Sequence, residues 1–575
     1  MDKHFDIRAV FCPQSFLCLR SYDRAQFGKD VMAGIIVGII AIPLAIAFGI
    51  SSGVGPTEGL VTAIVAGFLI SLLGGTRVQI GGPTGAFIVI IYGIIQQFGL
   101  SGLLMATVMA GILLVAMGLL RLGAVIRFVP YPVIVGFTAG IALTILTTQI
   151  NDLFGLGLTD LPANFIDKWI YYAHHVRQVD GWSLAIGLGS LLIIIFTPRV
   201  VKHMPGSLLA IVVATLAVWL LRRFGGVESV RTISDLYELP HGLPAPHLPT
   251  LQLEEGQTFF QLIQQLFPAA FTIAMLGAIE SLLSAMVADG VTGDRHDSNT
   301  ELIGQGIANI VVPFFGGIPA TGAIARTMAN INSGGRTPVA GLVHAVVLLL
   351  VLLFMGGLVG MIPMPCLAAV LVMVAYNMSG WRTIVGMLRD PKSDLAVLAV
   401  TFLLTVVFDL TVAIEVGMLL SVVLFLRRVS LSTSISVFRN EIDPNQESDL
   451  KLHEEKLHIP DGVEVYEIDG PYFFGIANKF DDMVRWVGNP AKVRVIRMRK
   501  VPFVDATGLH NLEMLCQRSH RVGTEVVLSG VRDNVRVSLL AHGFGTLLGE
   551  ENICPNINVA LARAARLAKA PAEVR

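Results

Sequence analysis

The sequence predicts a polytopic α-helical membrane protein that ends in a small soluble α/β domain. The first observation is composition: of 575 residues, 54% are hydrophobic and only 14% are charged, whereas a soluble domain carries about 25% charged residues. The second is a series of apolar stretches long enough to cross a bilayer. The third is a change to alternating strand-like and helix-like segments after residue 428, which indicates a separate folded unit.

Composition also narrows the function. The formal net charge is −1, so no basic surface argues for a nucleic-acid partner. The cysteines stand apart without ligand spacing, so we expect neither disulfides nor a metal site. No motif for nucleotide, metal or nucleophilic catalysis is present, and we expect neither enzyme activity nor a cofactor. Residues 1–28 lack the apolar stretch and cleavage site of a signal peptide and are expected to stay in the cytoplasm.

About fourteen hydrophobic segments make up the predicted transport domain, residues 29–428, as two inverted repeats of seven helices. Most approach the roughly 20 apolar residues that a spanning helix needs. They are 31–50, 57–74, 103–120, 128–149, 183–198, 206–221, 268–288, 301–315, 338–358, 363–378, 394–409 and 411–426. Glycine and proline interrupt the other segments, 83–95 and 320–331, which are too short to span alone.

Charge placement predicts the orientation. With the N-terminus inside, the predicted inner loops carry most of the positive charge, at Arg77, Arg121, Arg127, Arg199, Lys202, Arg295, Arg336, Arg382, Arg389, Lys392, Arg427 and Arg428. The short outer loops carry no lysine or arginine; they lie near 51–56, 96–102, 316–319, 359–362 and 409–411. This asymmetry predicts that both termini are cytoplasmic. Two long outer loops, 150–180 and 223–260, complete the topology.

Beyond the last span the chain becomes polar. Residues 429–460 are expected to be a linker. Strand-like VEVYEI (463–468) and VRVIRM (493–498) then alternate with helix-like segments. The prediction for 461–570 is therefore a soluble α/β domain, which an even number of spans places in the cytoplasm.

The two interrupted segments occupy corresponding places in the two repeats, taken as about 29–222 and 262–428. Pro-Thr-Gly-Ala at 83–86 matches Ala-Thr-Gly-Ala at 320–323, and a Gly-Gly pair precedes each. Paired broken helices in inverted repeats indicate the binding site of a transporter. Unpaired backbone persists in lipid only where it lines a cavity enclosed by protein.

These starts are suited to an anion. Each helix N-terminus carries roughly +0.5 charge and free N–H groups. Pro83 suits a first turn, and Gly85 and Gly322 let a ligand approach the backbone. We therefore expect a small anionic substrate at Pro83, Thr84, Gly85, Ala86, Thr321, Gly322 and Ala323. The alternative is that these glycines only allow close helix packing.

Two charged residues lie near this depth. Glu280 stands midway along an apolar span, so it should face a cavity, pair or be protonated. A structural hydrogen bond to a neighbouring helix is the alternative. Arg326 lies one turn into the second half-helix. It is expected to contact the substrate or to bridge to Glu280.

From about residue 25 to 565 the chain resembles the SulP anion permeases. The resemblance rests on AGIIVGIIAIPLAIAFGISSGVGPTEGL (33–60), GGPTGAF (81–87), ESLLSAMVAD (280–289), Ala325-Arg326-Thr327 and VPFVDATGL (501–509). It implies two inverted repeats of seven segments, a core domain that moves against a gate domain, a cytoplasmic STAS domain and a homodimer. Within the family the likeness is greatest to bacterial C4-dicarboxylic acid transporters.

The resemblance also implies site roles. A pocket aromatic falls on Phe48 and a pocket residue after the proline on Leu44. Glu280 and Ser284 take the places of an Asp–Thr pair that helps hold sodium in bicarbonate members, and this change favours a proton over sodium. At position 325 prestin-like members have serine where this chain has Ala325.

Thr507 stands where related STAS domains are phosphorylated. We interpret it first as a helix cap and second as a regulatory phosphorylation site. The domain itself is expected to bind cytoplasmic proteins.

The resulting hypothesis is proton-coupled uptake of a C4-dicarboxylate by an elevator-like movement. Two half-helix starts and Arg326 supply about +2 charges, and protonated Glu280 leaves that charge for a dianion. Sulfate or bicarbonate is the alternative substrate, because helix starts do not distinguish oxyanions. A membrane scaffold that acts through its STAS domain is the alternative of another class.

Overall fold

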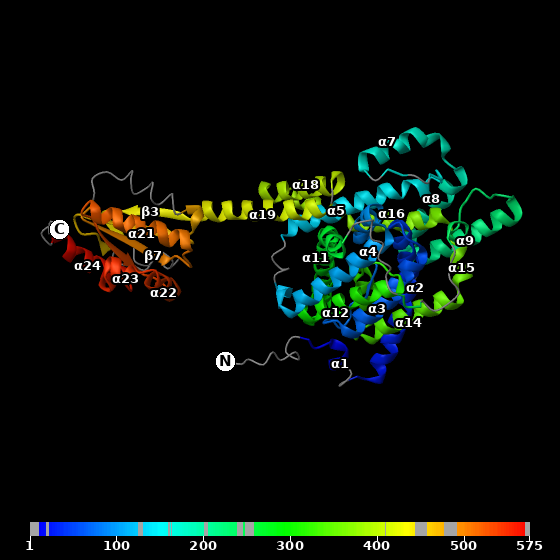
Figure 1. The fold of residues 1–575 in the computed structure, drawn as a ribbon, viewed down its shortest axis with the longest axis horizontal. Coiled ribbons are helices and arrows are strands. Elements are labelled where there is room, and N and C mark those ends of the chain that lie inside the picture. Colours follow the sequence, from blue (N-terminus) through cyan, green and yellow to red (C-terminus); the bar gives the residue numbers. More distant parts are fainter. Residues whose placement is uncertain are drawn as a thin grey trace. The chain divides into compact units, whose positions relative to one another are not determined.

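The structure is a computed structural model that describes residues 11–18, 22–124, 130–158, 161–162, 164–200, 205–237, 245–247, 258–408, 410–442, 457–476 and 491–569. The chain divides into two compact units, Met1–Ser421 and Val422–Arg575. The first is a bundle of helices and the second is built around a β-sheet (Figure 1).

The first half of the helical unit contains long apolar helices that touch through small residues. They are α2 (Arg24–Ser51), α3 (Pro56–Leu73), α4 (Ile88–Leu119), α5 (Tyr131–Thr148), α8 (Gly181–Val200) and α9 (Gly206–Gly225), and the short helix α1 (Gln14–Cys18) precedes them. A Cβ atom on Gly59 would lie 2.0 Å from the carbonyl oxygen of Ala45, so only glycine lets α2 and α3 approach this closely.

The second half repeats this pattern. Its elements are α11 (Phe259–Thr292), α12 (Ser298–Val311), η6 (Val312–Phe315), α14 (Val339–Phe354), α15 (Gly356–Gly360), α16 (Met364–Met378), α17 (Trp381–Met387), α18 (Lys392–Val407) and α19 (Leu410–Ser432). The halves interleave: α4 packs on α11 and α12, α14 packs on α2 and α3, and α5 packs on α16 and α18. The core is therefore shared between segments far apart in the sequence.

A short antiparallel pair of strands joins the halves at their interrupted segments. β1 (Gly81–Gly82) pairs with β2 (Thr321–Gly322). β1 leads through the 3₁₀ turn η3 (Gly85–Phe87) into α4, and β2 leads into α13 (Ile324–Asn332). Gly99, with φ 67° and ψ −175°, breaks α4 where the sequence predicts a connection between two segments. Both interrupted segments are thus half-helices that begin at the strand crossing.

The connections on the expected outer side carry short helices. They are α6 (Ile150–Leu153), α7 (Phe165–His175), η5 (Val176–Gln178) and α10 (Ile233–Leu236). The range 150–180, expected only as a loop, therefore contains the amphipathic helix α7, which packs on α5 and α18. One face of this short helix is apolar and the opposite face is polar.

Eight helices of the described part are long and apolar enough to cross a membrane, and Val339–Phe354 is a shorter apolar helix. Each of the expected hydrophobic ranges contains helix in the structure. The polytopic helical architecture is therefore confirmed, and the number of membrane crossings stays a prediction.

The second unit has a five-stranded sheet in the order β3-β6-β7-β8-β9. The strands are β3 (Ser434–Phe438), β6 (Val463–Asp469), β7 (Val493–Lys500), β8 (Glu525–Ser529) and β9 (Ile553–Cys554). β3 is antiparallel to β6 and the other pairs are parallel. The remaining elements are α21 (Ala506–Arg521), α22 (Asp533–Ala541), α23 (Phe544–Leu548), η7 (Glu550–Asn552), α24 (Ile557–Lys569) and the pair β4 (Glu441–Ile442) and β5 (Leu457–His458).

Helices cover both faces of this sheet, as the two apolar clusters on either side of β6 and β7 require. The predicted alternation of strand and helix is confirmed. The expected linker, 429–460, needs correction at its start, because β3 lies within it and forms an edge of the sheet. The mixed polar and apolar sequence of an edge strand gave no strong strand signal.

Candidate functional site

The strand crossing places two helix starts beside each other. Gly81 pairs with Gly322 and Gly82 with Thr321. Because the strands are antiparallel, the helices that follow them leave the crossing in opposite directions. Thr84 and Ala323 are the N-cap residues, and neither makes a side-chain cap hydrogen bond. The first backbone N–H groups of both half-helices are thus left for another acceptor, the arrangement that binds anions.

Glycine and proline create this geometry locally. Gly82 has a φ of 144°, which side chains other than glycine rarely adopt. A Cβ atom there would also lie 2.6 Å from Nη1 of Arg326. Pro83 has no N–H to continue the strand ladder and is tolerated just before a helix. These local requirements explain why the two half-helix starts could be predicted from the sequence.

Glu280 contacts the first half-helix directly. Its Oε2 accepts a hydrogen bond of 2.9 Å from Oγ1 of Thr84, the N-cap residue. Glu280 is partly exposed, whereas its neighbours Ile279 and Ser281 on α11 are buried. The carboxyl group therefore borders accessible space at the helix start rather than being packed in the core. A change in its charge is felt directly at the predicted anion site.

Arg326, on α13, contacts the same helix start from the second half-helix. Its side chain is 2% exposed, and Nη2 donates to the carbonyl oxygen of Pro83. Nη1 has no partner among the described residues. No ion pair between Arg326 and Glu280 occurs in the described structure, so the predicted bridge is not formed here. Contact between Arg326 and the substrate stays a prediction.

Ser284 links helices instead of facing Glu280. Its hydroxyl donates to Oγ1 of Thr327 over 3.3 Å, and that oxygen also accepts from the backbone N–H of Ile80. Ser284 is buried. It therefore holds α11 against α13 and β1 in this structure. A role of Ser284 in proton coupling stays a prediction.

Thr321 is similarly committed to the fold. Its hydroxyl lies 2.7 Å from the hydroxyl of Ser281 and donates to the carbonyl oxygen of Gly277. Gly322 donates its backbone N–H to Ser281. Ala323 is buried, while Ala325 is exposed on the first turn of α13. The accessible side of the second half-helix is therefore the side that carries Ala325.

Side chains from both halves of the helical unit lie close to Gly85. A Cβ atom on Gly85 would lie 3.1 Å from Sδ of Met378, 3.3 Å from Cδ1 of Ile145 and 3.5 Å from Cε1 of Phe48. Phe48 thus lies against the half-helix start, and its contact with a substrate stays a prediction. Ile145 and Met378 were missed, because an apolar side chain within an apolar span carries no distinguishing local signal.

Leu44 and Ala86 complete the predicted set. Leu44 is half-buried and packs against the apolar core of the helical unit. Ala86 is fully buried in η3. Both lie on the elements that frame the site, and their contact with a substrate stays a prediction.

A buried carboxylate that the sequence analysis missed anchors the approach to β1. Oε2 of Glu301 accepts from the N–H of Gly75 and the hydroxyl of Thr76, both over 2.9 Å. Oε1 accepts from the side-chain amides of Gln79, over 3.0 Å, and Gln305, over 2.8 Å. Two hydrogen bonds on each oxygen offset the cost of burying the carboxylate. Glu301 is the first residue of a predicted span. An acid at the end of a span is usually interpreted as lying at the membrane–water interface, so it gave no signal of an anchor.

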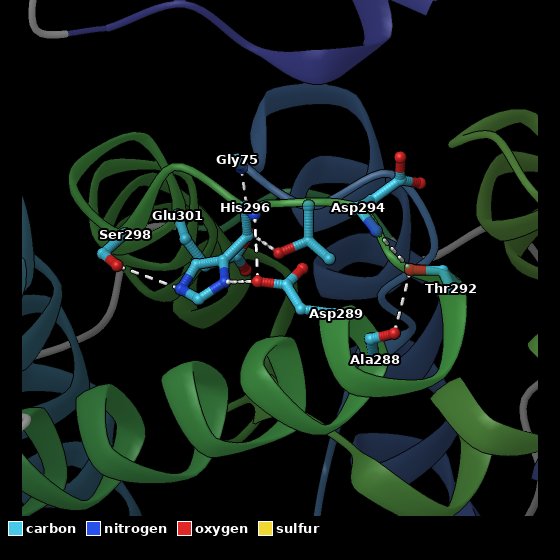
Figure 2. A network of polar contacts seen from close by, with 9 residues as sticks. Gly75, Ala288, Asp289, Thr292, Asp294, His296, Ser298 and Glu301 are labelled. Carbon is cyan, nitrogen blue, oxygen red and sulfur yellow. Dashed lines mark hydrogen bonds and ion pairs between the residues drawn. The ribbon is translucent and has the colours of Figure 1, made fainter.

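The loop between α11 and α12 fastens this approach from the side of the expected inner loops. Nδ1 of His296 lies 2.6 Å from Asp289, and Nε2 lies 2.9 Å from the hydroxyl of Ser298. The next backbone N–H, that of Asp297, donates to Gly75. Figure 2 shows the imidazole between Asp289 and Ser298, with Gly75 and Glu301 close by. The strand crossing is thus held by contacts between residues more than 200 positions apart.

In the second unit, the interpretation of Thr507 as the helix cap is wrong. The N-cap of α21 is Asp505, whose carboxylate accepts from the N–H of Gly508 over 2.7 Å. Thr507 is exposed in the first turn. The carboxylate of Asp505 occupies the place of the cap and leaves the hydroxyl of Thr507 free for solvent.

Comparison with known proteins agrees with this geometry. The model of the Sulfate permease family matches residues 27–401, and that of the STAS domain matches 456–560. The protein YvdB of Bacillus subtilis (strain 168), named as a candidate sulfate transporter, is 40% identical over 93% of this chain and 97% of its own length. The bicarbonate transporter BicA of Synechocystis sp. is 31% identical over 83% of each chain.

Solved structures show the same fold. The transmembrane domain of a cyanobacterial bicarbonate transporter BicA aligns with a TM-score of 0.60 at 32% identity, covering 70% of this chain and 98% of that domain. Murine Slc26a9, an anion transporter in the inward-facing state, aligns with a TM-score of 0.84 at 19% identity. It covers 98% of this chain and 95% of its own, and at that identity it supports the fold alone.

Proposed function

The chain belongs to the sulfate permease family and carries a STAS domain, and from this premise we propose that it takes up a small dianion together with a proton. It is a multi-pass membrane anion transporter and not an enzyme. The first candidates for the substrate are C4-dicarboxylates such as succinate, fumarate or aspartate. Transport proceeds by an elevator-like movement that exposes the half-helix site alternately to each side.

One contact carries the proposal: the hydrogen bond between Glu280 and Thr84 at the start of the first half-helix. A titratable group that touches the anion site couples its own protonation to anion binding. An ionised Glu280 repels an anion, whereas a protonated Glu280 leaves the positive potential of the helix starts unopposed.

Charge balance supports a dianion. The two helix starts together contribute about one positive charge. Arg326, which donates a hydrogen bond to the carbonyl oxygen of Pro83, contributes one more. A dicarboxylate brings two negative charges, so the occupied site is nearly neutral when Glu280 is protonated. A neutral site crosses the low-dielectric membrane interior at the least electrostatic cost.

The second candidate is an inorganic oxyanion. Two relatives favour it, because one is named as a candidate sulfate transporter and the other as a bicarbonate transporter. Free backbone N–H groups bind sulfate, bicarbonate and carboxylate alike. Phe48, Ile145 and Met378, which close over Gly85, are the side chains that we expect to discriminate among them by size.

The test is uptake of labelled succinate into proteoliposomes that contain the purified full chain, with and without an inward proton gradient. We expect the gradient to stimulate uptake and a sodium gradient to have no effect. Excess sulfate and bicarbonate should compete weakly. Uptake of sulfate or bicarbonate in place of succinate would move the assignment to the inorganic oxyanion, and the absence of any flux would favour a scaffold.

Glu280→Gln tests the coupling. The amide keeps the size of the carboxyl group and a partner for Thr84 but cannot exchange a proton. We expect it to remove stimulation by the proton gradient while substrate exchange across the membrane continues. Glu228→Gln, at an exposed position on an expected outer loop, is the matched control. Unchanged gradient-driven uptake in Glu280→Gln would refute coupling through this residue.

We further propose a homodimer in the bacterial inner membrane, with both termini in the cytoplasm. The STAS domain is then placed to bind cytoplasmic proteins. Exposed Thr507, in the first turn of α21, is the position at which a phosphate would be stabilised by the helix start.

A further inference from the structure

Lys168 is a buried cation outside the site described above. It lies on α7, and only 5% of its surface is exposed. Lysine is almost never buried to this extent without a partner of opposite charge. The burial of this lysine on the inner side of α7 therefore requires an explanation.

The partner of its ammonium group is an aromatic ring. Nζ lies 5.6 Å from the centroid of Tyr92, on α4. No ion pair of Lys168 with a described carboxylate is present, and Asp167 beside it bonds to Asn164. Burial lowers the pKa of Lys168 below its ordinary value. An anion beside the ammonium would offset this penalty, which the ring offsets only in part.

A cavity of about 80 Å³ adjoins Lys168. Its walls come from α4, α5, α7 and α18, and include the hydroxyl-bearing Thr144, Thr147 and Thr405. These hydroxyls donate to backbone carbonyls of their own helices, so their oxygens keep lone pairs that can still accept hydrogen bonds. Lone pairs accept hydrogen bonds from water, and the ammonium supplies the positive charge.

The cavity shares two helices with the half-helix site. Val89, in its wall, follows Gly85 by about one helical turn on α4. Thr144 and Thr147, also in its wall, lie on α5, the helix that carries Ile145 beside Gly85. The cavity and the predicted anion site are therefore framed by the same pair of helices.

We propose that the cavity beneath α7 is a second anion-binding subsite, in which Lys168 holds a partly hydrated carboxylate or inorganic oxyanion as it enters or leaves the half-helix site. This inference rests on the proposed function, since it assumes that the chain transports such an anion. Lys168 supplies the charge, and the threonine oxygens hold the water that the anion retains.

The experiment compares the wild-type chain with Lys168→Gln and Lys168→Arg. The concentration dependence of initial uptake in proteoliposomes gives KM and kcat, and isothermal titration of the purified full chain gives the affinity for succinate and for sulfate. Loss of one charge-assisted contact should raise KM and Kd about tenfold in Lys168→Gln. Kcat should stay within about twofold of wild type, because the half-helix site is intact, and Lys168→Arg should retain most of the affinity.

The matched control is Arg177→Gln, which removes an exposed cation from the same outer segment. It should leave KM unchanged, because solvent screens its charge. An equal rise of KM in both variants would reduce the role of Lys168 to long-range attraction and overturn the subsite. Unchanged KM and Kd in Lys168→Gln would overturn it directly.

A second pair of variants keeps the inference testable if Lys168→Gln does not fold. Thr147→Val removes a hydroxyl from the cavity wall and should raise KM about threefold. Thr138→Val removes a comparable hydroxyl, bonded within the same helix, and should not. Equal KM values overturn the subsite. If the wild-type chain neither transports nor binds any of these anions, the proposed function is overturned as well. If the wild-type chain transports normally and the variants have unchanged KM and Kd, the subsite alone is overturned.

Discussion

At the scale of single residues, the site depends on which polar atoms are used by the fold and which are left over. Thr321 and Ser284 spend their hydroxyls on contacts between helices. Glu280 and Thr84 bond to each other and stay partly accessible. A residue of the right type at the right depth is therefore not yet a ligand. Its hydrogen bonds decide whether it faces the substrate.

The cap of α21 shows the same distinction and can be tested. Asp505→Ala removes the acceptor of the Gly508 N–H and should destabilise the start of the helix by about 1 kcal/mol. Thr507→Ala should change it by less than about 0.5 kcal/mol. Hydrogen exchange of the first amides of α21, measured on the full chain by mass spectrometry, should accelerate about fivefold in Asp505→Ala alone. Acceleration in Thr507→Ala instead would restore threonine as the cap.

At the scale of elements, the half-helices are defined where β1 meets β2 and held in place from a distance. Backbone pairing of only two residues a strand is a weak ladder by itself. Glu301 and the loop at Asp297 fasten the segment before β1. Because these anchors lie on α12 and its preceding loop, the packing of α12 positions the predicted anion site without supplying any of its predicted residues.

A glycine pair on one element tests whether the start of the half-helix is the binding surface. Gly85→Ala would place a methyl group against the flexible ends of Met378, Ile145 and Phe48, so the fold should tolerate it. The methyl group would occupy the approach to the backbone N–H groups and lower uptake at least about tenfold. Gly93→Ala, on α4 with nothing within 4 Å of the added atom, should transport normally. Equal uptake by both variants would argue against an anion at Gly85.

At the scale of the whole molecule, charge predicts the orientation. Arginine and lysine concentrate on one set of predicted loops, and loops rich in these residues are expected on the cytoplasmic side. The second unit, Val422–Arg575, should then be cytoplasmic. Its sheet is closed on both faces by helices and its core is apolar, as expected for a domain exposed to water.

Protease accessibility checks this orientation. Trypsin added to inside-out vesicles should release peptides of the sheet domain, identified by mass spectrometry. Right-side-out vesicles should protect them. Release from right-side-out vesicles would invert the topology and place α7 and Lys168 on the cytoplasmic side, so the same experiment determines which face of the membrane the proposed subsite serves.

The sequence by itself determined the class of the protein, its helical segments, the strand–helix order of the second unit and the half-helix starts. These features depend on local composition, on hydrophobic runs and on the backbone limits of glycine and proline. Only the tertiary structure decided that Ile145 and Met378 close over Gly85, that Glu301 anchors β1 and that Lys168 adjoins a cavity. Each of these contacts depends on which distant helices pack together. A single acid, methionine or lysine in the sequence does not indicate which residues it will contact in the fold.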